Sequence, residues 1–171
     1  AEEGGIRVAV RLRPAKAGEV TGSPPPVAID HERRTVAVTQ KDSYGSPQVQ
    51  AHEFDQVYDH DCRQEDMYNE LGVPLLDKLF NWYNGTLFAY GQTGTGKTHS
   101  MLGPEGAEGT DQEGMIPRMI HEIFRRVMLE NELRAKKKTE EGVQSQLTVK
   151  CTYLEIYQEK LVDLLTPAHR N

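Results

Sequence analysis

Gly91-Gln92-Thr93-Gly94-Thr95-Gly96-Lys97-Thr98 is the most informative stretch of this 171-residue chain. It fits the phosphate-binding loop pattern of glycine, four residues, glycine, lysine, then serine or threonine. Glycines permit backbone angles that a Cβ disfavours, so that the N–H groups can surround a polyphosphate. In this pattern Lys97 reaches the β- and γ-phosphates and the Thr98 hydroxyl ligates Mg²⁺. We therefore predict a nucleotide site made of all eight residues, with Lys97 and Thr98 in catalytic roles and Thr98 as the metal ligand.

The residues on either side of this loop supply the context that the pattern requires. The apolar run Thr86–Tyr90 before it predicts a buried strand, and Lys97–Met101 predicts the start of a helix. The glycine- and proline-containing segment Gly103–Gly114 predicts a loop inserted into that helix, which resumes from Ile116. This strand–loop–helix order favours a nucleotide site over an incidental glycine-rich turn.

Strand and helix patterns alternate along the rest of the chain. Residues 67–83 carry apolar side chains at helical spacing, interrupted by Gly72-Val73-Pro74, which predicts a kinked helix or two short helices. Short or alternating apolar runs predict strands at residues 6–13, 27–29, 35–38, 53–58 and 147–153. Such alternation predicts an α/β domain, with the ligand at the carboxyl ends of the strands.

Composition narrows the class of protein. A formal net charge of -6 argues against a nucleic-acid partner, because phosphate backbones attract basic surfaces. Only two cysteines, Cys62 and Cys151, are present, which suits a reducing compartment better than a disulfide framework. No apolar run reaches membrane-spanning length and no signal peptide is evident, so we expect an intracellular protein without a membrane partner.

Asp59-His60-Asp61-Cys62 places four residues that can bind metal ions next to one another. It lacks a second ligand group at the spacing of a zinc site, and adjacent residues cannot all point at one ion. We therefore predict a solvated loop rather than a metal site.

Several separate pieces of the chain form a collinear series of motifs. Tyr83–Tyr90 runs into the phosphate loop, and His99-Ser100-Met101 follows it. Further pieces are Ile6–Pro14 with its Arg-x-Arg-Pro element, Phe54–Tyr58, Gly114–Arg118, Tyr153–Glu159 and Asp163–Leu165. Together these pieces resemble the N-terminal half of a kinesin motor domain. Gln158 stands where the family commonly has asparagine, and Thr152 where it has serine, both mild departures. The resemblance covers nearly all of residues 6–165.

This resemblance implies a P-loop NTPase fold, a central and mostly parallel sheet flanked by helices, and hydrolysis of ATP coupled to movement or force on microtubules. ATP, ADP and Mg²⁺ are the implied cofactors. The Arg-x-Arg-Pro element flanks the adenine in kinesins, which makes Arg11, Arg13 and Pro14 candidates for contact with the base. His99 is a further candidate by its position after the loop, with a surface histidine as the alternative.

Two kinesin motifs that sense and cleave the γ-phosphate, Ser-Ser-Arg and Asp-x-Ala-Gly, do not occur in this sequence. We therefore expect residues 1–5 to be a lead and residues 6–171 to be the N-terminal part of a motor domain. Its expected partners are the C-terminal half of the same domain and, through that half, microtubules. The expected location is the cytoplasm and cytoskeleton, including spindle or cilium. A non-motile kinesin-like binding module is the alternative, and an unrelated P-loop kinase or GTPase is disfavoured.

Overall fold

The structure is a computed structural model that describes residues 5–19, 26–136 and 145–166. The predicted lead at residues 1–5 therefore lies almost wholly outside the described residues. The chain forms two compact units that divide between Met119 and Ile120. No helix within the described residues is long and apolar enough to cross a membrane.

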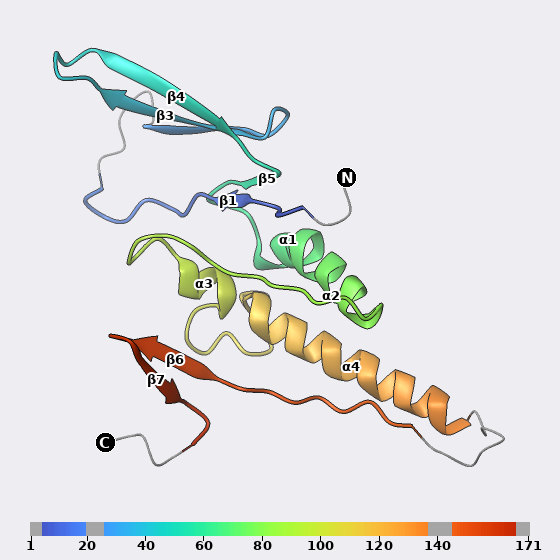
Figure 1. The fold of residues 1–171 in the computed structure, drawn as a ribbon. Helices are drawn as coiled ribbons and strands as arrows, with labels where there is room; N and C mark the ends of the chain where they lie inside the picture. The colour runs from blue at the N-terminus through green and yellow to red at the C-terminus, as the bar shows by residue number, and fades with distance from the viewer. Residues whose placement is uncertain (1–4, 20–25, 137–144, 167–171) are drawn as a thin grey trace. The chain divides into compact units, whose positions relative to one another are not determined.

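A two-stranded parallel sheet lies in the first unit, made of β1 (Ala9–Arg11) and β5 (Gln56–Tyr58) (Figure 1). Backbone bonds from Asp55 N–H to Val8 O and from Leu12 N–H to Tyr58 O continue the pairing on both sides, with N–O distances of 3.0 and 2.9 Å. The strand predicted at residues 6–13 is thus confirmed over its central residues, and the strand predicted at residues 53–58 over its last three.

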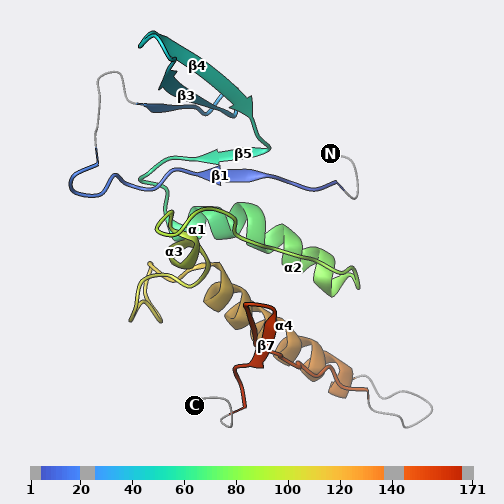
Figure 2. The same cartoon turned by 60° about the vertical axis from the view of Figure 1, so that its left-hand side comes forward.

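A second sheet in this unit is antiparallel, in the order β2 (Val27–Asp30), β3 (Thr35–Lys41) and β4 (Pro47–Glu53). Figures 1 and 2 show β3 and β4 running side by side over their whole length. The strands predicted at residues 27–29 and 35–38 are confirmed as the antiparallel pair β2 and β3. The strand β4 was not predicted. Its alternating residues Pro47, Val49 and Ala51 include only one large apolar side chain, and all seven residues of the strand are exposed.

The predicted kinked helix is continuous but changes its type. It runs from α1 (Gln64–Met67) through a π-helical turn, η1 (Tyr68–Gly72), into α2 (Val73–Phe80). A Cβ on Gly72 would lie 2.8 Å from Cδ2 of Tyr68 and 2.9 Å from Sδ of Met115, so a larger residue there would have to displace these side chains. The interruption read from the sequence is therefore a closely packed π-helical turn.

The buried core of the first unit is small. Tyr58, Met67 and Met115 form its centre, and Met115 begins α4 (Met115–Lys136). The Tyr58 hydroxyl donates to Oε2 of Glu70 at 3.0 Å. Burial and this bond raise the pKa of Tyr58 above its ordinary range, so the hydroxyl stays protonated and keeps the core neutral.

The strand predicted at Thr86–Tyr90 is wrong: this segment is extended but pairs with no other strand among the described residues. Phe88 is 74% exposed and Tyr90 95%. An apolar run makes a strand only where a neighbouring backbone completes the hydrogen-bond ladder. Neither sheet of the first unit extends to this segment.

The second unit contains α4 from Ile120 onward and an antiparallel hairpin of β6 (Leu154–Tyr157) and β7 (Lys160–Asp163). The strand predicted at residues 147–153 is wrong, and the strand lies immediately after it. The segment before the hairpin follows α4, because Asn131 Nδ2 donates to Leu147 O at 3.0 Å and Asn131 Oδ1 accepts from Leu147 N–H at 2.7 Å. The Asn131 side chain thus satisfies both backbone groups of Leu147, as the backbone of a neighbouring strand would.

Candidate nucleotide-binding site

Left-handed glycines shape the phosphate loop. Gly94 has φ of 83°, and Gly96, the residue before α3 (Lys97–Met101), has φ of 101°. A Cβ on Gly91 would lie 2.5 Å from Oγ1 of Thr95. These residues therefore curve the chain tightly, and Gly94 and Gly96 adopt the left-handed conformation that glycine permits.

The helix α3 begins within the loop, at Lys97. Its first backbone bond runs from Ser100 N–H to Gly96 O at 2.9 Å. The N–H groups of Lys97, Thr98 and His99 precede that bond, so they lie at the N-terminal end of the helix, where an intrahelical acceptor is lacking. Together with the loop they form a set of donors suited to phosphate oxygens.

The Lys97 ammonium folds over this loop. Its Nζ donates to Gly91 O at 2.7 Å and to Gln92 O at 2.9 Å. Thr95 Oγ1 donates to the same Gln92 oxygen at 2.8 Å. The loop therefore carries a positive charge of its own, held by carbonyl groups that phosphate oxygens could replace as acceptors.

Arg11 at the end of β1 reaches α3. Its Nη1 donates to Oε1 of Gln64 at 2.8 Å and to Oγ of Ser100 at 3.0 Å, and its Nη2 donates to Cys62 O at 3.0 Å. The structure thus brings this predicted base-side residue beside the helix that follows the phosphate loop. Its N–H edges are used by these bonds, while a guanidinium can still stack through its planar face.

The other two residues of the Arg-x-Arg-Pro element make local contacts. Arg13 donates to Pro14 O at 2.8 Å and forms a two-pronged pair with Glu19 at 2.8 and 2.5 Å. The Arg13 bond and the Lys16 N–H bond hold the pKa of Glu19 at about 2, so this turn keeps its ion pair at neutral pH. Within the described residues, no hydrogen bond joins Arg13 or Pro14 to the phosphate loop.

Lys16, which the sequence did not single out, does lie at the loop. Its Nζ is 3.2 Å from the position that a Cβ on Gly94 would occupy. The segment after Pro14 therefore brings a second positive charge, in addition to that of Lys97, close to the loop. The only signal in the sequence was its place two residues after the Arg-x-Arg-Pro element.

The His99 ring lies at the junction of α3 with α1. Partial burial, and then the charge of Arg11, lower its pKa, so the imidazole is neutral at pH 7. Its ring Nδ1 is 3.5 Å from Nε2 of Gln64. A neutral ring next to Arg11 retains a face that could lie against a base.

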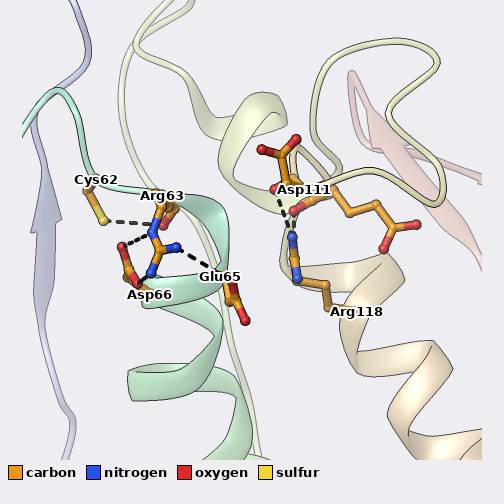
Figure 3. A network of polar contacts seen from close by, with 7 residues as sticks. Cys62, Arg63, Glu65, Asp66, Asp111 and Arg118 are labelled. Carbon is orange, nitrogen blue, oxygen red and sulfur yellow. Dashed lines mark hydrogen bonds and ion pairs between the residues drawn. The ribbon is translucent and has the colours of Figure 1, made fainter.

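The inserted loop Gly103–Gly114 is held near its C-terminal end by Arg118. Arg118 donates to Asp111 O at 2.8 Å and to Glu113 O at 2.9 Å (Figure 3). Arg63, the residue before Gln64, forms an ion pair with Asp66, in which Nη2 and Oδ1 are 2.6 Å apart. These contacts fix the end of the inserted loop and the start of α1.

Two other features do not add to this site. Asp59, His60 and Asp61 offer ligand atoms within 4.8 Å of one another, but the His60 ring pairs with Asp59 at 2.6 Å in an exposed loop. A hollow of about 400 Å³ is lined by Val8, Glu53, Phe54 and Asp55. It includes no residue of the phosphate loop, and its two carboxylates would repel a polyphosphate.

A family model described as the kinesin motor domain matches residues 11–171. The kinesin heavy chain of Neurospora crassa is 34% identical over 166 residues, which cover 97% of this chain and 16% of that protein. The kinesin-like protein KIF11 of Mus musculus is 36% identical over 170 residues, covering 95% of this chain and 15% of that protein.

Solved structures agree with the sequence comparison. The Drosophila kinesin family member Kin10/NOD, in complex with divalent manganese and ADP, matches with a TM-score of 0.71 and 30% identity over 98% of this chain. Drosophila NOD complexed to the microtubule without nucleotide matches with a TM-score of 0.70 and 30% identity over 95% of this chain. These matches cover 50% and 48% of those chains. The P-loop NTPase fold predicted from the sequence is confirmed.

Proposed function

The chain belongs to the kinesin motor domain family, and from this membership we propose that the intact protein couples ATP hydrolysis to movement or force on microtubules. The observation that carries the proposal is the loop itself. It joins left-handed glycines, the Lys97 ammonium and the start of α3 in one place, beside Arg11. These are the parts from which a protein builds a triphosphate cradle.

Within this site Gly91–Thr98 bind the phosphates of ATP or ADP. Lys97 exchanges its bonds to Gly91 O and Gln92 O for phosphate oxygens, and the Thr98 hydroxyl is the ligand for Mg²⁺. When bound, the metal neutralises the charge that develops on the phosphates. Kin10/NOD was solved with a divalent cation and ADP, which supports this cofactor class.

We assign the adenine side to Arg11, Arg13, Pro14 and His99. The contacts of Arg11 and the lowered pKa of His99 support this assignment, because both groups lie where α3 meets β1. Arg13 is included because its bond to Glu19 closes the turn that also brings Lys16 to the phosphate loop. Stacking against a purine needs a planar face rather than a particular donor.

We further propose that residues 6–171 act as the N-terminal part of a motor domain whose remainder pairs with the unpaired segment Thr86–Tyr90. The exposed side chains of Phe88 and Tyr90 support this, as does the half-length match to the NOD chains. That remainder would supply the groups that sense the γ-phosphate and most of the microtubule-binding surface. The proposed location is the microtubule cytoskeleton, including spindle or cilium.

The test is ATP turnover by the intact protein with and without microtubules. We expect stimulation by microtubules, and Lys97→Ala should abolish turnover in both conditions. Turnover that microtubules leave unchanged, with nucleotide and microtubule binding both retained, would replace the motor by a non-motile binding module.

A further inference from the structure

Gln64, the first residue of α1, is a polar side chain enclosed by the protein. It is 5% exposed. Its amide joins three segments that are distant in the sequence: β1 through Arg11, α3 through His99, and the end of the inserted loop through Gln112. Nothing in the sequence distinguished it from the other glutamines.

Both ends of this amide are used with the correct polarity. Oε1 accepts from Arg11 at 2.8 Å, while Nε2 donates to His99 O at 2.6 Å and to Gln112 O at 3.3 Å. A glutamate would keep the partner for Arg11 but place negative oxygen against two carbonyl groups. A methionine of similar length would lose the bond from Arg11 and the bonds to both carbonyl groups.

The helix α3 depends on such contacts for its position. It has five residues and none of them is buried. A helix this short is unstable in isolation, so contacts from outside must hold it. Arg11 contributes by donating to Ser100 Oγ, and Gln64 contributes through His99 O while also holding Arg11. Met101 adds an apolar contact with the buried core.

We infer that Gln64 is a positioning residue for the nucleotide site. It sets the distance between Arg11 on the base side and α3, which carries Lys97 and Thr98 on the phosphate side. The inference rests on the proposed function, because it assumes one ligand that spans both sides. Such a ligand gains affinity when its two subsites are held at the right separation before it binds.

The experiment compares two ligands of the intact protein. Mg·ADP spans both sides of the site, whereas tripolyphosphate contacts only the phosphate side. For Gln64→Met we expect the Kd of Mg·ADP to rise about tenfold and the Kd of tripolyphosphate, measured by displacement, to change by less than about twofold. Gln64→Glu should weaken Mg·ADP at least as much, although it keeps the Arg11 contact. The exposed Gln50→Met on β4 is the matched control, with both affinities unchanged.

Thermal unfolding of each variant shows whether it is folded at the temperature of the titration. If Gln64→Met does not fold, Ser100→Ala removes the other link between Arg11 and α3, and should weaken Mg·ADP about threefold while sparing tripolyphosphate. An equal loss for both ligands, or no loss for either, in folded variants would overturn the role of Gln64 alone. A wild-type protein that binds neither ligand would overturn the proposed function with it.

Discussion

The phosphate loop has the unpaired segment Thr86–Tyr90 on one side and α3 on the other, and the structure holds these two neighbours very differently. The segment before the loop has the more apolar sequence, yet it leaves Phe88 74% exposed. The helix after the loop is short and buries none of its residues, yet buried Gln64 and Arg11 fix its place. Each neighbour packs one apolar side chain against the buried core, Leu87 before the loop and Met101 after it. The polar contacts of Gln64 and Arg11 are what distinguish α3 from the segment before the loop.

The largest test of this difference is Phe88→Ala in the intact protein. If the remainder of the motor domain pairs with Thr86–Tyr90, Phe88 becomes buried, and its truncation should cost about 3 kcal/mol of unfolding free energy. Tyr44→Ala, in an exposed turn, is the control and should cost less than about 0.5 kcal/mol. Chemical denaturation measures both. If Phe88→Ala and Tyr44→Ala lose equally little unfolding free energy, Thr86–Tyr90 stays unpaired in the intact protein as well.

On the other side of the loop, Lys97→Ala should reduce Mg·ATP affinity about 100-fold, or ~2.7 kcal/mol, because the phosphates lose a charged donor. Equilibrium titration of the intact protein checks this. Lys41→Ala, an exposed lysine at the end of β3, is the matched control and should bind normally. Unchanged affinity in Lys97→Ala would show that the loop does not bind phosphate.

A third substitution probes how closely the end of α3 is held. A Cβ on Gly114 would lie 2.6 Å from Gly103 N and from Leu102 N, both backbone atoms that cannot rotate away. Gly114→Ala should therefore cost about 2 kcal/mol of stability, in the range of overpacking. Gly5→Ala, where a Cβ meets nothing within 4 Å, should be neutral in the same thermal unfolding experiment. A neutral Gly114→Ala would mean that this junction yields easily.

The smallest effect concerns the protonation of His99. Its pKa is lowered in the folded protein, so the unfolded chain binds the proton more readily, and stability should fall as pH drops below about 6.5. Because the ring is largely exposed, the effect should stay below about 0.5 kcal/mol. Unfolding at pH 7.5 and 5.5 measures it, and His99→Gln should remove it. An identical pH dependence in His99→Gln would assign it to another group.

Features with a local cause could be read from the sequence. Gly94 and Gly96 adopt the left-handed conformations that the loop pattern requires, and helix α3 follows them. The resumption of helix at Met115 has an equally local cause, namely the end of a glycine-rich loop. In each case the backbone angles of a few residues were sufficient.

Features that depend on distant neighbours could not be read. Thr86–Tyr90 has the composition of a strand and lacks a partner, so it forms none. The hairpin of β6 and β7 turns through Gln158 and Glu159, both at positive φ, where asparagine or glycine would have announced a turn. Gln64 gained its role only when the fold brought three segments around it.

The inserted loop between α3 and α4 closes on itself at its base. Gly114 N–H donates to Leu102 O at 3.1 Å, and the glycines Gly103 and Gly114 lie back to back there. Residues added between them would lengthen a loop whose ends are already joined, and doubling such a loop costs only about 0.6 kcal/mol. The segment between Gly103 and Gly114 could therefore accept a reporter peptide or an inserted tag, provided that both glycines are kept.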